Sequence, residues 1–250
     1  MNVNRVKTDQ IKGDKLELIF FGDQHIGSKD SDMEAIQKQI DWIKNKKNVL
    51  VILMGDTVNC ALKGSVGAGS YDDTMNPDQQ IDTAIEIFTP IKEKILGIHN
   101  GNHGNRVYNE TTISPEKVIS QALNVPYLGD TCFHHIRFGN QTYIVHTAHG
   151  STGATTVGGA LNSCMKYANF NQADLYAMGH THNLATYNQV YHEVSKKDKT
   201  MLKKKKFFVL TGGYLKWKGS YAEAKAYAPL KIGCAKATLN GERHDIHVSV

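Results

Sequence analysis

Five short polar blocks, each following an apolar run, constrain this 250-residue sequence more than any other feature. In chain order they are Asp23-x-His25, Gly55-Asp56, Gly101-Asn102-His103, His149-Gly150 and Gly179-His180-Thr181-His182. The runs at residues 16–21 (LELIFF) and 49–54 (VLVILM) have the length and composition of buried strands. Because ligands of open α/β sheets bind beyond the carboxyl ends of strands, we expect these blocks to meet in one polar cluster.

The first half of the chain alternates predicted strands and helices. The predicted strands are residues 16–21, 49–54 and 95–98. A helix is predicted over residues 32–47, with Ser31 and Glu34 at capping-box spacing. Two more helices are predicted to begin at Asn76-Pro77 and Ser114-Pro115, and residues 64–70 read as a Gly- and Ser-rich loop.

The second half is richer in predicted strands. Hairpins are predicted around Gly139-Asn140 and Asn240-Gly241, with further strands at residues 175–178 and 207–210 and a helix at 160–170. This order predicts an α/β fold with sheet at the centre and helices outside. No linker divides the chain, so we expect one domain over residues 1–250.

Composition and charge exclude some classes of protein. A net charge of +5 is compatible with an anionic ligand but too small to indicate nucleic-acid binding. No apolar run approaches the roughly 20 residues of a membrane span, and residues 1–15 lack a signal-peptide core. We therefore expect a cytoplasmic protein with no membrane partner, in which the four scattered cysteines are free thiols.

The residue types of the five blocks suit a pair of divalent metals. Two such ions neutralise phosphoryl oxygens and convert water to hydroxide near neutral pH. One carboxylate can reach both ions. Mixed imidazole and carboxylate ligands favour Mn, Fe, Zn, Co or Ni over Mg or Ca, and we expect Mn. An Asn side-chain oxygen adds a ligand without charge.

The set D-x-H, G-D, G-N-H, H-G and G-H-T-H resembles that of the calcineurin-like metallophosphoesterases, and the glycines after His149 resemble small phage- and prophage-type members. The resemblance spans roughly residues 17–182 and implies a four-layer sandwich of two mixed β-sheets flanked by helices. It implies that one metal is bound by Asp23, His25, Asp56 and His182. It implies that the second is bound by Asp56, Asn102, His149 and His180, with Asp56 bridging.

The implied activity is hydrolysis of a phosphate ester by metal-bound hydroxide. His103 is then a phosphate binder or the general acid on the leaving oxygen, Asn102 lies beside the substrate, and Arg106 is a candidate phosphate clamp. Two points stay open. His146 and His149 stand near the end of one predicted strand, with His149 fitting the pattern better. Gly104 stands where the family usually has Asp or Glu, which weakens the case for His103 as an acid.

The substrate is left open by the sequence. A lysine-rich run at residues 196–206 (KKDKTMLKKKK) favours a solvated hairpin tip, with a phosphate-tracking arm for nucleic acid as the alternative. Tyr214, Trp217 and Tyr221 are predicted to pack in the core, with base stacking as the alternative. A phosphodiesterase or nuclease therefore competes with a phosphomonoesterase or protein phosphatase, and with an inactive metal-binding scaffold. The oligomeric state is not predicted.

Overall fold

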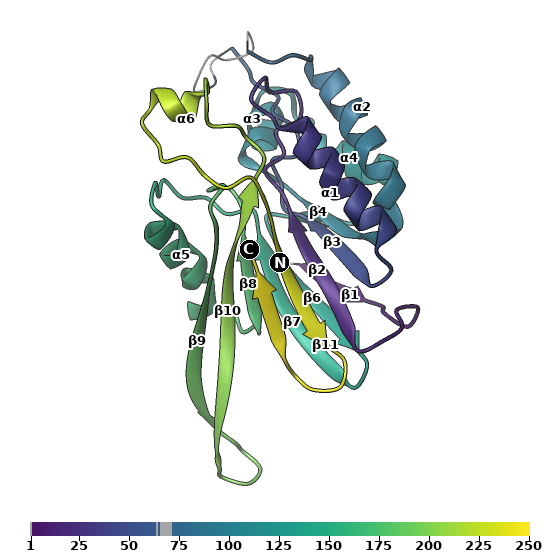
Figure 1. Cartoon of the computed structure of the whole chain (residues 1–250), viewed down its shortest axis with the longest axis vertical. Helices are drawn as coiled ribbons and strands as arrows, with labels where there is room; N and C mark the ends of the chain where they lie inside the picture. Colours follow the sequence, from purple (N-terminus) through teal and green to yellow (C-terminus); the bar gives the residue numbers. More distant parts are fainter. Residues whose placement is uncertain (1, 64, 66–71) are drawn as a thin grey trace.

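The computed structural model describes residues 2–63, 65 and 72–250, so the predicted loop at 64–70 lies, apart from Ser65, outside the described residues (Figure 1). The described strands form one twelve-stranded mixed sheet with the order β1-β6-β7-β8-β10-β11-β2-β3-β4-β5, in which β9 pairs β10 and β12 pairs β11. One half consists of β1 (Asn2–Val6), β6 (Thr131–Phe138), β7 (Gln141–Ala148), β8 (Leu175–Met178), β9 (Leu184–Val194) and β10 (Met201–Gly213). The other half consists of β2 (Lys15–Phe21), β3 (Val49–Leu53), β4 (Ile95–His99), β5 (Tyr127–Gly129), β11 (Gly233–Asn240) and β12 (Ile246–Ser249).

Helices cover the outer faces of both halves (Figure 1). They are α1 (Met33–Asn45), α2 (Pro77–Phe88), α3 (Asn102–Thr111), α4 (Pro115–Leu123), α5 (Val157–Met165) and the short α6 (Tyr221–Ala224), with 3-10 turns η2 (Thr89–Lys94) and η3 (Lys166–Asn169). Figure 1 shows α1, α2 and α4 beside the half that contains β2 and β3, and α5 beside β9 and β10.

The side chains of strand β2 show why this arrangement is stable. Leu18 and Phe20 point to one face and pack in a cluster with Tyr143 and Val145 of β7, so the two halves of the sheet bury apolar surface against each other. The alternate residues of β2 point to the other face and pack with Ile36 and other residues of α1. Because both faces of the strand are buried, its sequence is almost continuously apolar.

The mixed α/β architecture is confirmed, but the expected division into two separate sheets is not. Strands β10 and β11 pair at Gly212 with Cys234 and at Gly213 with Gly233, and this short ladder joins the two halves into one hydrogen-bonded path. The predicted strands and the last hairpin are present, and the cysteines are free.

Several predicted details of the helices are wrong. Asp32 caps α1 by accepting from the Ala35 amide, whereas the Ser31 hydroxyl donates to the Gln24 carbonyl, so the expected capping box does not form. The helix predicted at 160–170 begins three residues earlier, at Val157 with its N-cap at Thr156, and its last turn is the 3-10 turn η3, which ends at Asn169. The helix predicted to begin at Asn76-Pro77 is α2, and Asn76 forms a capping box with Gln79 that was not predicted.

The helix α3 and the strand β1 were not predicted at all. The helix α3 begins inside the Gly-Asn-His block, and glycine and asparagine are typical of turns, so the sequence carries no helix signal there. Strand β1 is polar and largely exposed, so it carries no apolar pattern, and it forms by pairing in parallel with β6.

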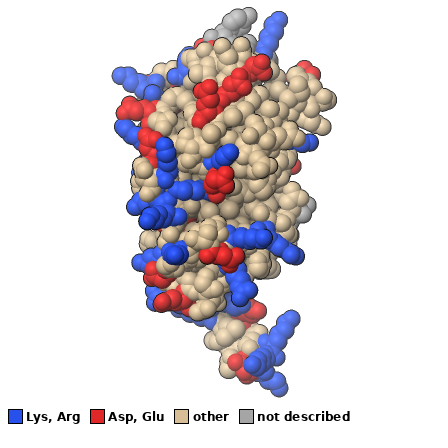
Figure 2. All heavy atoms as spheres, turned by 90° about the vertical axis from the view of Figure 1, so that its right-hand side faces the viewer, with Lys and Arg blue, Asp and Glu red and all other residues tan. Residues whose placement is uncertain are grey.

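The lysine-rich run lies in a hairpin that projects from the body of the protein (Figure 1). The strand β10 begins at Met201, so Lys203 to Lys206 belong to the strand and only the earlier lysines lie at the tip. Figure 2 shows Lys and Arg side chains gathered at this projecting end. The 13 residues of β10 span on the order of 40 Å, and Gly213 is at the far end from the tip.

Candidate metal centre

The ends of five strands bring the predicted ligands together. Asp23 follows β2, Asp56 follows β3, and Asn102 follows β4. His149 directly follows β7, and the block from Gly179 to His182 directly follows β8. Parallel pairing of β2 with β3 and of β3 with β4 places their carboxyl ends at the same edge of the sheet, as the sequence predicted.

The carboxylate of Asp56 lies at the middle of this cluster. It is 1% exposed, and its Oδ1 accepts from the backbone amide of His103 at 2.9 Å, in the first turn of α3. The positive end of a helix stabilises a carboxylate in this place. A Cβ added to Gly101 would lie 2.1 Å from Asp56 Oδ1, so glycine is required for the strand end to approach the carboxylate this closely.

The backbone is strained at the same residues. Asp23, His25, Asp56, His180 and His182 all have positive φ, between 46° and 68°. Left-handed backbone is uncommon for residues other than glycine and costs on the order of 1 kcal/mol or more for each residue. Such strain gathers at functional sites, where the surrounding structure holds it. Five strained residues that all face one point therefore indicate a site rather than five unrelated turns.

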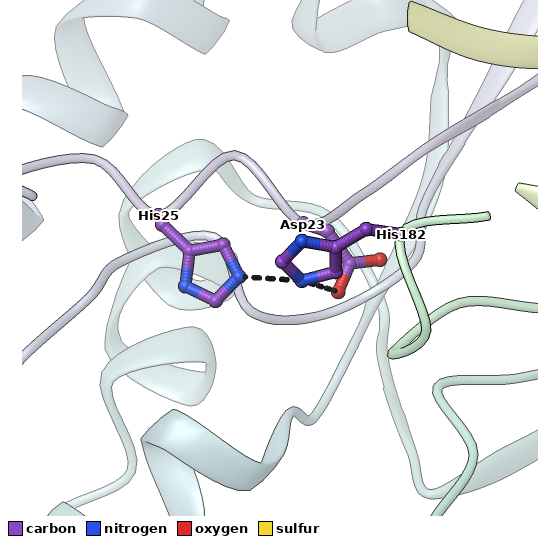
Figure 3. Close-up of side chains that lie close together, drawn as sticks. All are labelled: Asp23, His25 and His182. Carbon is purple, nitrogen blue, oxygen red and sulfur yellow. Dashed lines mark hydrogen bonds and ion pairs between the residues drawn. The ribbon is translucent and has the colours of Figure 1, made fainter. Parts of the chain in front are cut away.

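The first group of donors is Asp23, His25 and His182 (Figure 3). His182 Nε2 lies 3.3 Å from Asp23 Oδ1 and 3.1 Å from His25 Nε2. Figure 3 shows the two imidazole rings and the carboxylate converging, with His25 contributed by the segment after β2 and His182 by the segment after β8. His25 Nδ1 is buried without a hydrogen-bond partner among the described residues.

The second group contains Asp56, His149 and His180, with Asn102 between the two rings. His149 Nε2 lies 3.3 Å from Asp56 Oδ2 and 3.0 Å from Asn102 Oδ1. His180 Nδ1 lies 2.7 Å from Asn102 Oδ1. Asp56 Oδ2 is also 4.0 Å from His25 Nε2, so this one carboxylate adjoins both groups.

The hydrogen bonds on the outer side of the rings fit a metal centre. His149 Nδ1 donates to the Met54 carbonyl at 2.9 Å, and His180 Nε2 donates to the Thr152 carbonyl at 3.1 Å. The remaining nitrogen of each neutral ring then presents a lone pair toward Asp56 and Asn102 oxygens. Facing lone pairs repel unless a cation or a proton lies between them. Backbone carbonyls that fix the outer nitrogen are typical of metal-binding histidines, so this donor set fits divalent metals.

The pKa values of Asp56 and His149 reflect the same crowding. Burial alone would lower the pKa of His149, but the charge of Asp56 and its hydrogen bond outweigh burial and raise the pKa to about 10. Burial alone would raise the pKa of Asp56, but the charges of His149 and His103 hold it well below its usual range.

His103 lies at the mouth of the cluster. Its Nε2 is 3.9 Å from Asp56 Oδ2, and its side chain is 19% exposed. Its Nδ1 donates to the Asn59 carbonyl at 2.7 Å, which fixes the ring orientation without any carboxylate. Asp73 anchors the segment around Asn59 by accepting from the Asn59 side chain, from the Ala61 amide and from Gln80.

Arg106 lies on α3 close to the cluster, whereas His146 lies in the core, away from it. Arg106 is half-buried on α3, and its Nε has no hydrogen-bond partner among the described residues. His146 lies inside β7, where its Nε2 contacts the Asn171 side chain at 3.1 Å and its ring packs against Phe133 and Tyr167. The structure therefore brings His149 into the cluster and leaves His146 in the core.

A buried carboxyl group occupies the space beside Gly104. A Cβ at Gly104 would lie 2.0 Å from Oε2 of Glu116, which belongs to α4. The side chain of Glu116 is fully buried, and neither of its oxygens has a hydrogen-bond partner among the described residues. Burial, aided by the charge of Asp56 and opposed by His149, raises the pKa of Glu116 to about 8. Glycine at 104 is thus matched by a carboxyl group from a different helix.

Sequence reasoning missed the groups that support the site. The carbonyls of Met54, Asn59 and Thr152 act through the backbone, which any residue type provides, so no residue signal could reveal them. Glu116 follows the Ser-Pro helix start and reads as an ordinary first-turn acid. Its only signal was Gly104, the departure from the usual motif.

Comparisons with known proteins add only distant similarities. No protein-family model and no curated protein matches the sequence. Among solved structures, Vacuolar Protein Sorting 29 from Cryptosporidium parvum is 14% identical over 95% of this chain and 98% of its own, with a TM-score of 0.45. The Haemophilus influenzae NAD nucleotidase NadN is 11% identical over 94% of this chain and 49% of its own, with a TM-score of 0.42.

The calcineurin-like phosphoesterase YfkN from Bacillus subtilis is 11% identical over 78% of this chain and 91% of its own, with a TM-score of 0.35. Similarities this distant support no conclusion about activity.

Within the described ranges 2–63, 65 and 72–250, no helix is long and apolar enough to cross a membrane.

We predict that Glu116→Gln stabilises the metal-free protein increasingly as the pH rises. The pKa of Glu116 is raised from 4.5 in the unfolded chain to about 8, so the stability it contributes is fully present below about pH 4.5 and is lost as the pH rises through about 8. Glutamine stays neutral throughout. Urea unfolding in chelator should show the difference in unfolding free energy growing by on the order of a few kcal/mol between about pH 5 and about pH 8.

The control is Glu110→Gln, an exposed acid on the neighbouring helix α3, for which we expect no such trend. A constant offset between Glu116→Gln and wild type at every pH would contradict the account, because it would mean that Glu116 ionises alike in both states.

Proposed function

We propose that this chain is a dinuclear metal-dependent phosphoesterase of the calcineurin-like type. In this proposal, the two halves of the sheet and the helices on their outer faces correspond to the layered sandwich of that family. The observation that carries the proposal is the position of Asp56, whose Oδ2 is 3.3 Å from His149 Nε2 and 4.0 Å from His25 Nε2. A carboxylate between two sets of donors is the bridging ligand that a metal pair needs. The fold alone would not support this proposal, since a fold hosts many functions.

One metal would be held by Asp23, His25, Asp56 and His182, and the other by Asp56, Asn102, His149 and His180. Manganese is our preferred metal, with Fe, Zn, Ni or Co as alternatives, because the donors mix imidazole nitrogens with oxygens. When bound, the pair supplies positive charge for the phosphoryl oxygens and an activated water for attack on phosphorus.

The chain's own side chains then orient the substrate and handle the leaving group. His103 faces the site through Nε2, because the Asn59 carbonyl fixes Nδ1 as the donor on the other side. Nε2 in its protonated form can contact a phosphoryl oxygen or deliver a proton to the leaving oxygen. The guanidinium of Arg106 adds charge nearby and is suited to a bidentate contact with phosphate.

The lysine-rich hairpin does not extend this site. It projects from the end of β10 opposite to Gly213, so its lysines are far from the metal ligands. Nothing in the hairpin therefore favours nucleic acid as the substrate of the centre, and the choice between phosphodiester and phosphomonoester depends on measurement.

We predict that His182→Gln abolishes Mn²⁺-dependent hydrolysis of bis-(p-nitrophenyl) phosphate and p-nitrophenyl phosphate. Removing one ligand should lower kcat/KM by more than about 100-fold, since even changes outside the ligand shell cost 10- to 100-fold. The matched control is His192→Gln, an exposed histidine on β9, which should keep wild-type turnover. Chelator should remove the activity of both proteins.

The preferred ester identifies a diesterase or a monoesterase. A wild-type protein that binds Mn²⁺ and hydrolyses neither ester would contradict the enzymatic proposal and indicate a metal-binding scaffold.

We predict that His103→Gln affects esters according to their leaving groups. A general acid is needed for an alkoxide, whereas p-nitrophenolate leaves without a proton. The loss in kcat should be about 10²- to 10⁴-fold for an alkyl ester and much smaller for the aryl ester with the same metal. Equal losses for both esters would assign His103 to phosphate binding instead.

A further inference from the structure

A cavity of about 500 Å³ adjoins the candidate metal centre. Its walls come from the segment at 152–157, the segment at 180–183 that contains His180 and His182, and the long segment at 213–232 that contains α6. Cavities of this size hold ligands as large as a mononucleotide or a small drug. A cavity beside the centre can therefore hold the part of a substrate that adjoins the phosphate.

The cavity and the metal centre share a wall. His180 and His182, both candidate ligands, line the cavity, as does Gly213. An added Cβ at Gly213 would lie 3.0 Å from His182 Cγ, so the chain at the cavity wall runs directly against the ring. A molecule whose phosphate contacts the metal centre can therefore place a neighbouring part in this cavity.

The lining of the cavity is aromatic and exposed. Tyr221 is 39% exposed and Tyr227 is 44% exposed, and their rings meet edge to face with centroids 6.3 Å apart. Trp217 donates from its indole nitrogen to the Tyr227 carbonyl at 2.6 Å, which fixes its ring beside them. Val157 and Leu230 are also exposed and line the same space. Only Tyr214 of the predicted aromatic group packs in the core, at 1% exposed.

Polar groups lie among these apolar walls. Lys231 lines the cavity and makes no ion pair with any described residue, whereas Lys216 lies 3.9 Å from Asp32. The side chains of Asp30, Thr155 and Asn183 also line it. An acyl chain would leave these donors and acceptors unpaired, whereas a ligand with a flat apolar face and polar edges can stack on the rings and pair with the polar groups. A planar heterocycle with polar edges uses both.

We propose that this cavity binds the nucleoside portion of a small phosphate ester, with the base stacked on Trp217 and Tyr221 and the phosphate at the metal centre. The proposal rests on the proposed function and narrows its substrate to nucleotides of about one base. It favours them over long nucleic acids, because the exposed lysines of the hairpin lie at the other end of β10. Trp217 and Tyr221 are then residues that determine specificity.

The test compares esters that differ only in the nucleoside. With Mn²⁺, the diester pair is thymidine 5′-(p-nitrophenyl) phosphate and methyl p-nitrophenyl phosphate, which share one leaving group and one charge. The monoester pair is adenosine 5′-monophosphate and ribose 5-phosphate. The proteins are wild type, Trp217→Ala, Tyr221→Ala and, as a matched control, Tyr187→Ala, an exposed tyrosine of β9 that does not line the cavity.

We expect the wild-type ratio of kcat/KM, nucleoside ester over its partner, to exceed about 10 in the pair that is hydrolysed. Loss of one stacking ring should lower this ratio by about 10-fold, toward a value of about one. Tyr187→Ala should keep it. Tyr221→Ala serves as the second variant if Trp217→Ala is poorly folded, since Tyr221 is on the surface.

The outcomes separate this inference from the proposed function. Esters hydrolysed with a ratio near one, or with a ratio that neither variant changes, would overturn the nucleoside site and leave the phosphoesterase standing. If no ester is hydrolysed, the phosphoesterase proposal fails, and a binding measurement then tests whether the cavity holds a nucleoside.

This measurement uses tryptophan fluorescence. The sequence has two tryptophans, so Trp42→Phe leaves Trp217 as the reporter. Saturable quenching by adenosine 5′-monophosphate that Tyr221→Ala abolishes would support the site, and no quenching would overturn it.

Discussion

The burial of one carboxylate, that of Asp56, organises the structure around it. A charge removed from water is costly unless hydrogen bonds and opposite charges compensate for it. Here the amide of His103 donates from the first turn of α3, and His149 Nε2 lies 3.3 Å from Asp56 Oδ2. The close approach at Gly101 and the strained backbone of Asp56 follow from the need to bring these groups together.

The apolar strands hold that strain in place. β2 and β3 are buried on both faces. Because a packed core has few voids, the ends of these strands have little room to move. Their carboxyl ends then present Asp23 and Asp56 at one edge. The cavity beside the centre is built differently, from an excursion after β10 that adds aromatic side chains without disturbing the sheet.

Much of the site could be predicted from the sequence, because each ligand block directly follows an apolar run whose direction is fixed by burial. Asp23, Asp56 and His180 are predicted in this way, and the structure brings the three residues into one cluster. The sequence motif favours His149 over His146 but leaves His146 as an alternative. The choice depends on β7 continuing to Ala148, which directs the two side chains to different environments. The join between β10 and β11 was hidden, because two backbone pairs leave no side-chain pattern. The nearness of Glu116 to Gly104 arises from the packing of α3 against α4, which no local pattern encodes.

The central claim is that Asp56 joins two metal sites, and the most direct measurement is the stoichiometry and coupling of bound Mn²⁺. Metal analysis after gel filtration, combined with electron paramagnetic resonance, should find two ions per chain with the multiline signal of an exchange-coupled pair. Asp56→Asn should lose the coupling, because an amide cannot bridge as a carboxylate does. A wild-type protein with one ion per chain, or with two ions that show only the six-line signal of isolated Mn²⁺, would contradict the bridge and the dinuclear centre built on it.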